Sequence, residues 1–253
     1  MLSTDEIADY HRNGYIIPNF RLANDEVEEI KATHARLLDK HPVFRDYCPN
    51  LLAYDTSFLN IARHATILDM VEQVLGPHFA LWNSSFFAKP AHNGKRTPWH
   101  QDGEYWPIRP LATCTVWIAL DPSTPKNGCL RVIQGSHKDA TLHRHRTVEA
   151  GDVTLHQELT PDSFDPRHAV DLILEAGQIS LHDVYILHGS AANTSDVPRR
   201  GMTLRYMPTT SVFDRQLARQ MHTNMGITDH SDRTLYLMRG TDQSGQNDFR
   251  MRF

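Results

Sequence analysis

Cysteine is scarce in this chain of 253 residues, which contains only Cys48, Cys114 and Cys129. The three thiols are odd in number and widely spaced, so they suggest neither a disulfide framework nor the closely spaced ligand pairs of a structural zinc site. We therefore expect reduced thiols, as in an intracellular protein.

Long apolar runs and an excess of positive charge are also missing. No run approaches the roughly 20 residues that span a membrane, and the first residues carry no basic-then-apolar signal. The formal net charge is −4, which argues against a general nucleic-acid binder. We therefore expect a cytoplasmic protein that binds a small-molecule substrate, binds neither nucleic acid nor membrane, and acts as a monomer or homodimer.

Helices are expected before residue 78 and strands after it. Ser3–Glu6 is typical of a capping box, and Asn24–Val27 opens a second helix with acidic residues suited to the N-terminal helix dipole. Apolar residues at helical spacing predict a third helix over 65–75, and Gly14–Pro18 predicts a short strand between the first two helices.

We expect one domain, because 253 residues are enough to bury one sizeable core. Residues 1–77 would form its helical N-terminal support, residues 78–210 its β-rich core, and residues 211–253 a C-terminal covering segment. That last segment has a polar, irregular pattern. It could cover the mouth of the core or contact a second copy of the chain.

The core begins with an expected strand over 79–89, in which alternate side chains should point to the same face. One face would carry Leu81, Asn83, Ser85, Phe87 and Lys89. Asn83, Ser85 and Lys89 could therefore enter a pocket.

The most informative feature is the His-x-Asp pair formed by His100 and Asp102. Its aromatic neighbours Trp99, Tyr105 and Trp106 supply the dry wall that is typical of a buried site. Two imidazoles and one carboxylate can occupy one face of an octahedral Fe(II) and leave the opposite face open for a cosubstrate and oxygen. This reading requires one further histidine.

Other His-x-acid pairs occur, and their sequence context distinguishes them from the first. They are His137/Asp139, His156/Glu158 and His230/Asp232. All lie in polar, turn-like segments, so we expect solvated loops there. The basic run His143–Arg146 also predicts a solvated face, with contact to an anionic substrate as the alternative.

His182 and His188 are the candidates for the third ligand, since both lie in the apolar, strand-like stretch 178–190. Residues six apart on an extended strand point to the same face. His188 is favoured because Gly189 permits a close backbone approach and Ser190 adds a hydroxyl. His182 could be an alternative ligand, a partner of a ligand, a substrate contact or a hydrogen-bonded core histidine.

Arg199 and Arg200 follow a turn and begin the next expected strand, which would return antiparallel and bring Arg199 near Ser190. A guanidinium can fork onto a carboxylate with two parallel hydrogen bonds and stays charged when it is desolvated. Neighbouring residues on a strand point to opposite faces, so we expect one arginine to be buried and the other exposed.

Several segments, taken in order, resemble the phytanoyl-CoA dioxygenase family of Fe(II)/2-oxoglutarate oxygenases, and the resemblance covers about residues 4–210. An ordered set of motifs is far more specific than any one of them. The segments are Lys89–Pro90, Trp99–Asp102, Trp117–Leu120, Asn127–Leu130, Gly135–Lys138, Leu187–Ser190 and Pro198–Gly201.

The resemblance implies a mainly β fold, a double-stranded β-helix (a cupin-like jelly roll) with flanking N-terminal α-helices packed outside. It implies that Fe(II) is the metal, with 2-oxoglutarate and O2 as cosubstrates. The implied metal ligands are His100, Asp102 and His188, and Arg199 is implied to hold the distal carboxylate of 2-oxoglutarate. The resemblance also suggests cosubstrate contacts from Ser190, Trp117, Ser85 and Gln101.

We therefore expect a dioxygenase that hydroxylates a small polar or zwitterionic metabolite and releases succinate and CO2. The intact carboxylate of Asp102 favours hydroxylation over the halogenation that related enzymes with a small residue there perform. A cupin-type metal hydrolase or isomerase and a non-catalytic ligand-binding jelly roll are the alternatives. The residues expected to line the substrate pocket are Asn83, Lys89, Glu104, Tyr105, Trp106, Arg109, His182 and the C-terminal segment.

Overall fold

Two antiparallel β-sheets dominate the structure, a computed structural model that describes residues 1–249. The larger sheet contains, in spatial order, β1 (Tyr15–Ile16), β11 (Ile179–Asp183), β6 (Cys114–Ala119), β13 (Arg199–Pro208), β3 (Phe79–Lys89) and β15 (Tyr236–Arg239), and β2 (Tyr47–Cys48) also pairs with β3. The smaller sheet contains β10 (Ala169–Leu172), β7 (Leu130–Ile133), β12 (His188–Ser190) and β4 (Thr97–His100).

Two short ribbons complete the β-structure. One pairs β14 (Val212–Phe213) with β5 (Ile108–Arg109), and the other pairs β8 (His145–Thr147) with β9 (Gln157–Leu159). The two main sheets enclose a cavity between them, to which both contribute side chains. This arrangement is the double-stranded β-helix, or jelly roll, that the sequence resemblance implied.

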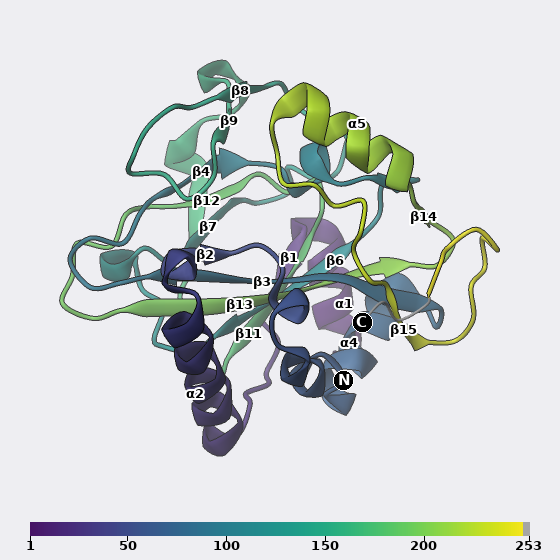
Figure 1. Ribbon diagram of the computed structural model, residues 1–253, viewed down its shortest axis with the longest axis horizontal. Coiled ribbons are helices and arrows are strands. Elements are labelled where there is room, and N and C mark those ends of the chain that lie inside the picture. Colours follow the sequence, from purple (N-terminus) through teal and green to yellow (C-terminus); the bar gives the residue numbers. More distant parts are fainter. Residues whose placement is uncertain (250–253) are drawn as a thin grey trace.

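The N-terminal helices cover one side of the larger sheet. They are α1 (Thr4–Asn13), α2 (Asn24–Lys40), α3 (Leu59–Ala62) and α4 (Ala65–Leu75), and α5 (Arg215–Met225) follows the last long strand. In Figure 1, α2 and α4 lie on one side of the larger sheet, while α5 and the smaller sheet lie on the other. Apolar residues of α1, α2 and α4 pack in one cluster with those of β3, β6, β11 and β13, because each helix buries one apolar face.

The expected N-terminal elements are confirmed. The Ser3 hydroxyl accepts a hydrogen bond from the Glu6 N–H (3.2 Å), and the Glu6 carboxylate accepts one from the Ser3 N–H (2.7 Å). This reciprocal capping box starts α1. The helix ends at Gly14, whose φ of 82° is the left-handed conformation that glycine adopts without strain. Helix α4 has the predicted bounds.

The expectation that Leu81 shares a face with Asn83 is wrong. The pairing of β3 with β13 shifts register here, because Arg205 lies opposite Asn83 while the next residue, Tyr206, lies opposite Leu81. The extra residue, Trp82, forms a bulge that interrupts the alternation of side chains. Leu81 therefore packs into the cluster under the helices, whereas Asn83 lines a cavity on the other side.

The C-terminal segment is more regular than its polar sequence suggested. The Asp214 carboxylate accepts a hydrogen bond from the Leu217 N–H (2.8 Å) and caps α5, and β15 adds an edge strand to β3. Within the described residues, no helix is both long enough and apolar enough to cross a membrane.

Candidate active site

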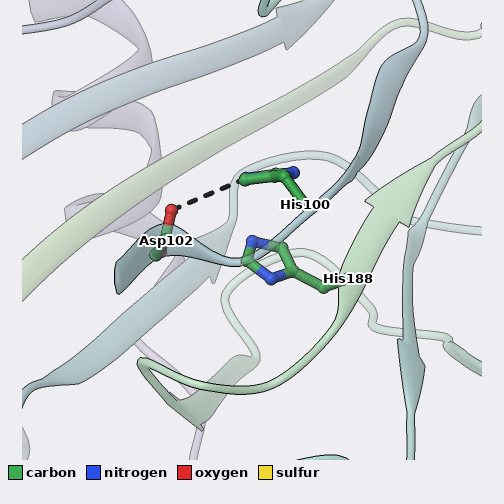
Figure 2. A group of neighbouring side chains, drawn as sticks. All are labelled: His100, Asp102 and His188. Carbon is green, nitrogen blue, oxygen red and sulfur yellow. Dashed lines mark ion pairs between the residues drawn. The ribbon is translucent and has the colours of Figure 1, made fainter. Parts of the chain in front are cut away.

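His100, Asp102 and His188 come together where β4 pairs with β12. His188 lies directly opposite His100 in this antiparallel pair, and Asp102 follows β4 at the start of a short 3-10 turn, residues 102–105. One ligand atom from each side chain lies within 4.8 Å of the other two, and all three residues are buried. Figure 2 shows the three side chains turned toward one another, with His100 Nε2 3.5 Å from an Asp102 carboxylate oxygen.

Backbone carbonyls orient both imidazoles. His100 Nδ1 lies 2.8 Å from the Pro98 carbonyl, and His188 Nδ1 lies 3.0 Å from the Ile186 carbonyl. Because a carbonyl oxygen can only accept, each Nδ1 carries the proton, and each Nε2 keeps its lone pair for a metal. The donor set, two imidazoles and one carboxylate, fits a divalent iron.

The protonation states of the triad also suit a metal. Burial by itself would raise the pKa of Asp102, but the nearby Arg205 guanidinium and the two imidazoles outweigh it and hold the pKa well below its usual range. Burial, together with the neighbouring His100, lowers the pKa of His188 well below its usual value. At neutral pH the carboxylate is therefore charged and the His188 imidazole is neutral.

His182 lies beside the triad on β11 and does not belong to it. Its Nε2 is 4.0 Å from an Asp102 oxygen, and its ring centroid is 5.2 Å from that of His188. Its Nδ1 is buried without a hydrogen-bond partner among the described residues. Burial lowers the pKa of His182 to about 4. The structure therefore places a neutral third imidazole, incompletely hydrogen-bonded, against the triad.

Arg199 begins β13 and is only 2% exposed. Its Nε donates a hydrogen bond to the Gly128 carbonyl and its Nη1 donates to the Phe87 carbonyl, both at 3.1 Å. The guanidinium stacks on the Trp117 indole, 5.4 Å from the ring centroid. Arg199, Trp117 and Ser190 line the same inner cavity as the triad. Burial lowers the pKa of Arg199 to about 10, so the group stays charged at neutral pH.

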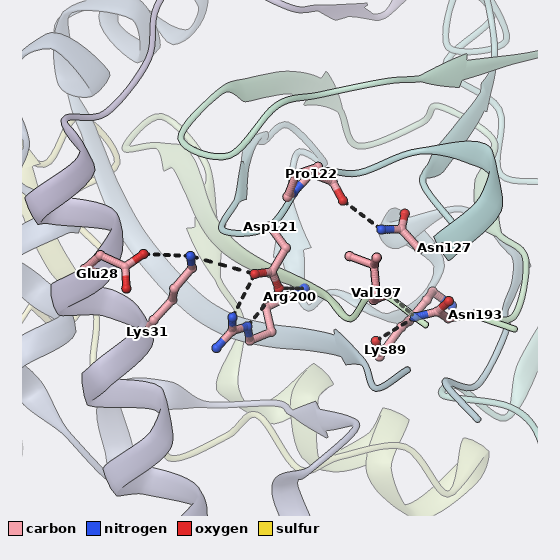
Figure 3. A network of polar contacts seen from close by, with 9 residues as sticks. All are labelled: Glu28, Lys31, Lys89, Asp121, Pro122, Asn127, Asn193, Val197 and Arg200. Carbon is pink, nitrogen blue, oxygen red and sulfur yellow. Dashed lines mark hydrogen bonds and ion pairs between the residues drawn. The ribbon is translucent and has the colours of Figure 1, made fainter. Parts of the chain in front are cut away.

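Arg200 points to the opposite face, as expected from the strand alternation. Its guanidinium binds both carboxylate oxygens of Asp121, at 2.7 and 2.8 Å, and its N–H donates to the same carboxylate. Lys31 on α2 lies 3.8 Å from Asp121 and pairs with Glu28 (Figure 3). Arg200 is therefore not a simple solvated edge residue, since this network ties the start of β13 to a helix.

Two cavities meet at the triad. The inner cavity lies between the two sheets, and an outer cavity of about 330 Å³ shares part of its lining. Both are lined by His100 and Asp102, and also by Phe87 and Arg205. A molecule in either cavity would contact the triad.

Several of the proposed site residues line these cavities. The outer cavity has Asn83, Tyr105 and Trp106 in its wall, and the inner cavity has Trp117, His182, Ser190 and Arg199.

Other proposed site residues lie elsewhere. The Gln101 side-chain amide donates to the carbonyls of Thr141 (2.9 Å) and Tyr185 (2.7 Å), so it fastens loops behind the triad. The buried Lys89 amine donates to the Lys95 carbonyl, and the exposed Arg109 donates to main-chain carbonyls of its own segment.

Ser85 reaches the site only indirectly. Its hydroxyl accepts a hydrogen bond from Arg205 Nη1 at 2.6 Å.

Three cavity residues were missed from the sequence. Arg205 lies six residues beyond Arg199 on the same strand, so period-two alternation could have placed it on the inward face. The expectation of a solvated loop at His230 is wrong, because this residue is 8% exposed, packs on Trp82, and accepts a hydrogen bond from Arg233 at 2.7 Å. His156 is exposed to solvent and also lines the outer cavity.

Two buried histidines on neighbouring strands of a double-stranded β-helix, with a carboxylate just beyond one of these strands, are typical of the non-haem metal oxygenases and their cupin relatives. The family model described as phytanoyl-CoA dioxygenase (PhyH) matches residues 10–201. The chain belongs to this family.

Curated relatives agree with that assignment. The chain is 32% identical over 149 residues to the probable alpha-ketoglutarate-dependent hypophosphite dioxygenase of Stutzerimonas stutzeri, a match that covers 58% of this chain and 51% of that protein. It is 26% identical over 236 residues to the peroxisomal phytanoyl-CoA dioxygenase of Rattus norvegicus, covering 81% and 68%. The chain thus spans between about half and two thirds of the length of these relatives.

Solved structures share the fold. The apo form of the non-heme monooxygenase ThoJ superimposes with a TM-score of 0.75 at 25% identity, over 96% of this chain and 86% of that one. EvdO2 from Micromonospora carbonacea, solved in complex with 2-oxoglutarate, superimposes with a TM-score of 0.70 at 21% identity, over 82% and 91%.

Proposed function

We propose that this protein is an Fe(II)- and 2-oxoglutarate-dependent dioxygenase that hydroxylates a small polar or zwitterionic metabolite and releases succinate and CO2. One observation carries the proposal. A buried His-Asp-His triad, oriented by backbone carbonyls, shares a cavity with a buried, charged arginine.

The triad would hold the iron through His100 Nε2, His188 Nε2 and the Asp102 carboxylate. When bound, Fe(II) supplies the redox chemistry that couples decarboxylation of 2-oxoglutarate to oxidation of the substrate by O2. The protein contributes the fixed tautomers of the two imidazoles and the charge of the carboxylate. It also keeps the triad buried and so limits access of bulk water.

The inner cavity would take 2-oxoglutarate. Arg199 lines this cavity and stacks on Trp117, and its remaining guanidinium N–H groups can form paired hydrogen bonds to the distal carboxylate. The Trp117 indole supports one face of the guanidinium, and Ser190 lines the same cavity and can add a hydrogen bond through its hydroxyl.

The outer cavity would take the substrate. Its aromatic wall, which includes Tyr105 and Trp106, suits a site from which water must be excluded, and its volume of about 330 Å³ suits a small metabolite. Gly226, Ile227, Thr228 and His230 form part of its wall. We propose that the chain works as one domain in the cytoplasm, as a monomer or homodimer, with 211–253 as its covering segment.

An anaerobic titration of metal-free protein with Fe(II) and 2-oxoglutarate tests the function before any substrate is known. The chelate should produce a weak visible charge-transfer band. The band should be lost in His188→Ala and strongly weakened in Arg199→Ala. A folded wild-type protein without this band would contradict the proposal and favour a cupin-type metal hydrolase or isomerase, neither of which needs Arg199 or oxygen.

A further inference from the structure

Arg205 is a buried cation at the junction of the two cavities. Its side chain is 6% exposed and lines both of them. Nη1 donates to the Ser85 hydroxyl, but Nε has no hydrogen-bond partner within residues 1–249. The guanidinium lies 5.1 Å from the Trp106 ring centroid and 5.8 Å from that of Phe87. Arg205 therefore keeps donor capacity that the described protein groups leave unused.

Negative charge is scarce around this guanidinium. Asp102 is the only acidic residue in the described lining of the two cavities, and its nearer oxygen lies 3.9 Å from Arg205 Nε. This distance is too long for a hydrogen bond. In the proposed function, the same carboxylate is a metal ligand, so it cannot serve as a full counter-charge for Arg205.

A second buried guanidinium lies behind the outer wall. Arg233 is 4% exposed and donates to His230 Nδ1 (2.7 Å), the Asn83 side-chain oxygen (2.6 Å) and the Pro49 carbonyl (3.0 Å). All three acceptors are uncharged. Burial lowers the pKa of Arg233 to about 10, so the group remains a cation at neutral pH.

The formal charges of the site with Fe(II) and 2-oxoglutarate bound leave positive charge in excess. Two positive charges on Fe(II) and one on Arg199 balance two negative charges on 2-oxoglutarate and one on Asp102. Arg205 and Arg233 find no further counter-charge in the described lining of the two cavities. An uncompensated charge in a buried site is costly, so such cations indicate that the missing anion arrives with a ligand.

We propose that Arg205 anchors an oxyanionic group of the substrate in the outer cavity, so that the substrate is a small organic acid. The proposal rests on the function proposed above and narrows its substrate class. A guanidinium recognises a carboxylate or a comparable oxyanion through paired, charge-assisted hydrogen bonds. Because Arg205 also lies close to Asp102, the carbon that reacts lies within a few bonds of the acid group.

Matched pairs of probes test this inference without knowledge of the substrate. Butyrate is compared with butyramide, and phenylacetate with phenylacetamide, because each pair differs in charge and little in shape. The probes are titrated anaerobically into protein that contains Fe(II) and saturating 2-oxoglutarate, so that the Arg199 site is already filled. Fluorescence of Trp82 and Trp106, which pack against each other beside the outer cavity, reports binding.

Wild-type protein should bind each carboxylate at least tenfold more tightly than its amide. Arg205→Gln should abolish this preference, and Arg205→Lys, which keeps the charge, should restore part of it. The matched control is Arg36→Gln, which removes the same charge from an exposed position on α2 and should bind the probes as wild type does.

Three outcomes would overturn the inference. Wild-type protein that binds acid and amide alike, or binds neither, has no anion site. An Arg205→Gln variant with an intact preference shows that the anion binds elsewhere. A folded Arg205→Gln variant that cannot form the visible band shows that Arg205 only positions Asp102. The band in wild-type protein reports the proposed function separately, so a missing band there is distinguished from a missing preference.

Discussion

Gly201→Ala should weaken 2-oxoglutarate binding although residue 201 needs no contact with the cosubstrate. Gly201 lies on β13 and pairs with Phe87 on one side and Ala119 on the other, so its backbone is held from both sides. A Cβ placed there would lie 2.2 Å from a ring carbon of Trp117 and 2.9 Å from the indole nitrogen. Real Cβ contacts essentially never fall below 3.0 Å, so the indole has to move.

The expected losses of stability and of 2-oxoglutarate affinity depend on the contacts of the Trp117 indole. Trp117 is 4% exposed and cannot swing into solvent, so the added methyl group should lower the unfolding free energy by about 1–3 kcal/mol, the usual cost of overpacking. The indole also carries the Arg199 guanidinium at 5.4 Å. Loss of this stacking would also misalign the Arg199 guanidinium with the distal carboxylate of 2-oxoglutarate. Binding of 2-oxoglutarate should therefore weaken by about tenfold, which corresponds to about 1.4 kcal/mol.

The assay is the anaerobic titration of the Fe(II)-loaded protein with 2-oxoglutarate, combined with urea unfolding. Gly151→Ala is the matched control, because a Cβ at that position would meet nothing within 4 Å. If Gly201→Ala bound 2-oxoglutarate as tightly as wild type and unfolded at the same urea concentration, the indole would not be the platform for Arg199.

Three more predictions test individual groups. Asp102→Ala should bind Fe(II) too weakly to form the visible band and should lose hydroxylation; retained wild-type turnover would refute the triad. Arg199→Ala should raise the 2-oxoglutarate dissociation constant at least tenfold more than Arg200→Ala, and the reverse order in the same titration would move the anchor by one residue. Burial lowers the pKa of Lys89 to about 6, so between pH 7 and 9 the unfolded chain binds a proton there that the folded chain does not. The difference in unfolding free energy between wild type and Lys89→Met, measured by urea unfolding, should therefore rise in favour of wild type by up to roughly 1.4 kcal/mol per pH unit. A difference that does not change with pH would contradict a buried neutral lysine.

The sequence predicts what local patterns and strand alternation determine. The capping box at Ser3 sets the start of α1, and the turn after Ser190 returns the chain so that Arg199 lies on the inward face. The proximity of His100, Asp102 and His188 also followed, because ordered motifs of a known family carry tertiary information that a single strand lacks.

Other features depend on local irregularities that the spacing of apolar and polar residues in the sequence does not predict. The bulge at Trp82 reverses the face of Leu81, and alternation counted from either end of β3 fails across it. His230 lies in a segment whose polar residues predict solvent exposure, yet the buried Arg233 guanidinium donates a hydrogen bond to His230, and the residue is buried. Gln101, next to two proposed ligands, turns away because two loop carbonyls and one loop N–H satisfy its amide.

The two cavities differ in what they are made of. Apart from Asp102, the inner lining consists of residues on strands of the two sheets, so a change there would disturb the pairing that holds the fold together. Much of the outer wall comes from connecting segments outside the main sheets, including residues 154–156, 226–228 and 230. Loops accept substitution and insertion more readily than paired strands. Replacing those segments is therefore a route by which the same oxidation chemistry could be directed to new substrates while the triad and the inner cavity stay unchanged.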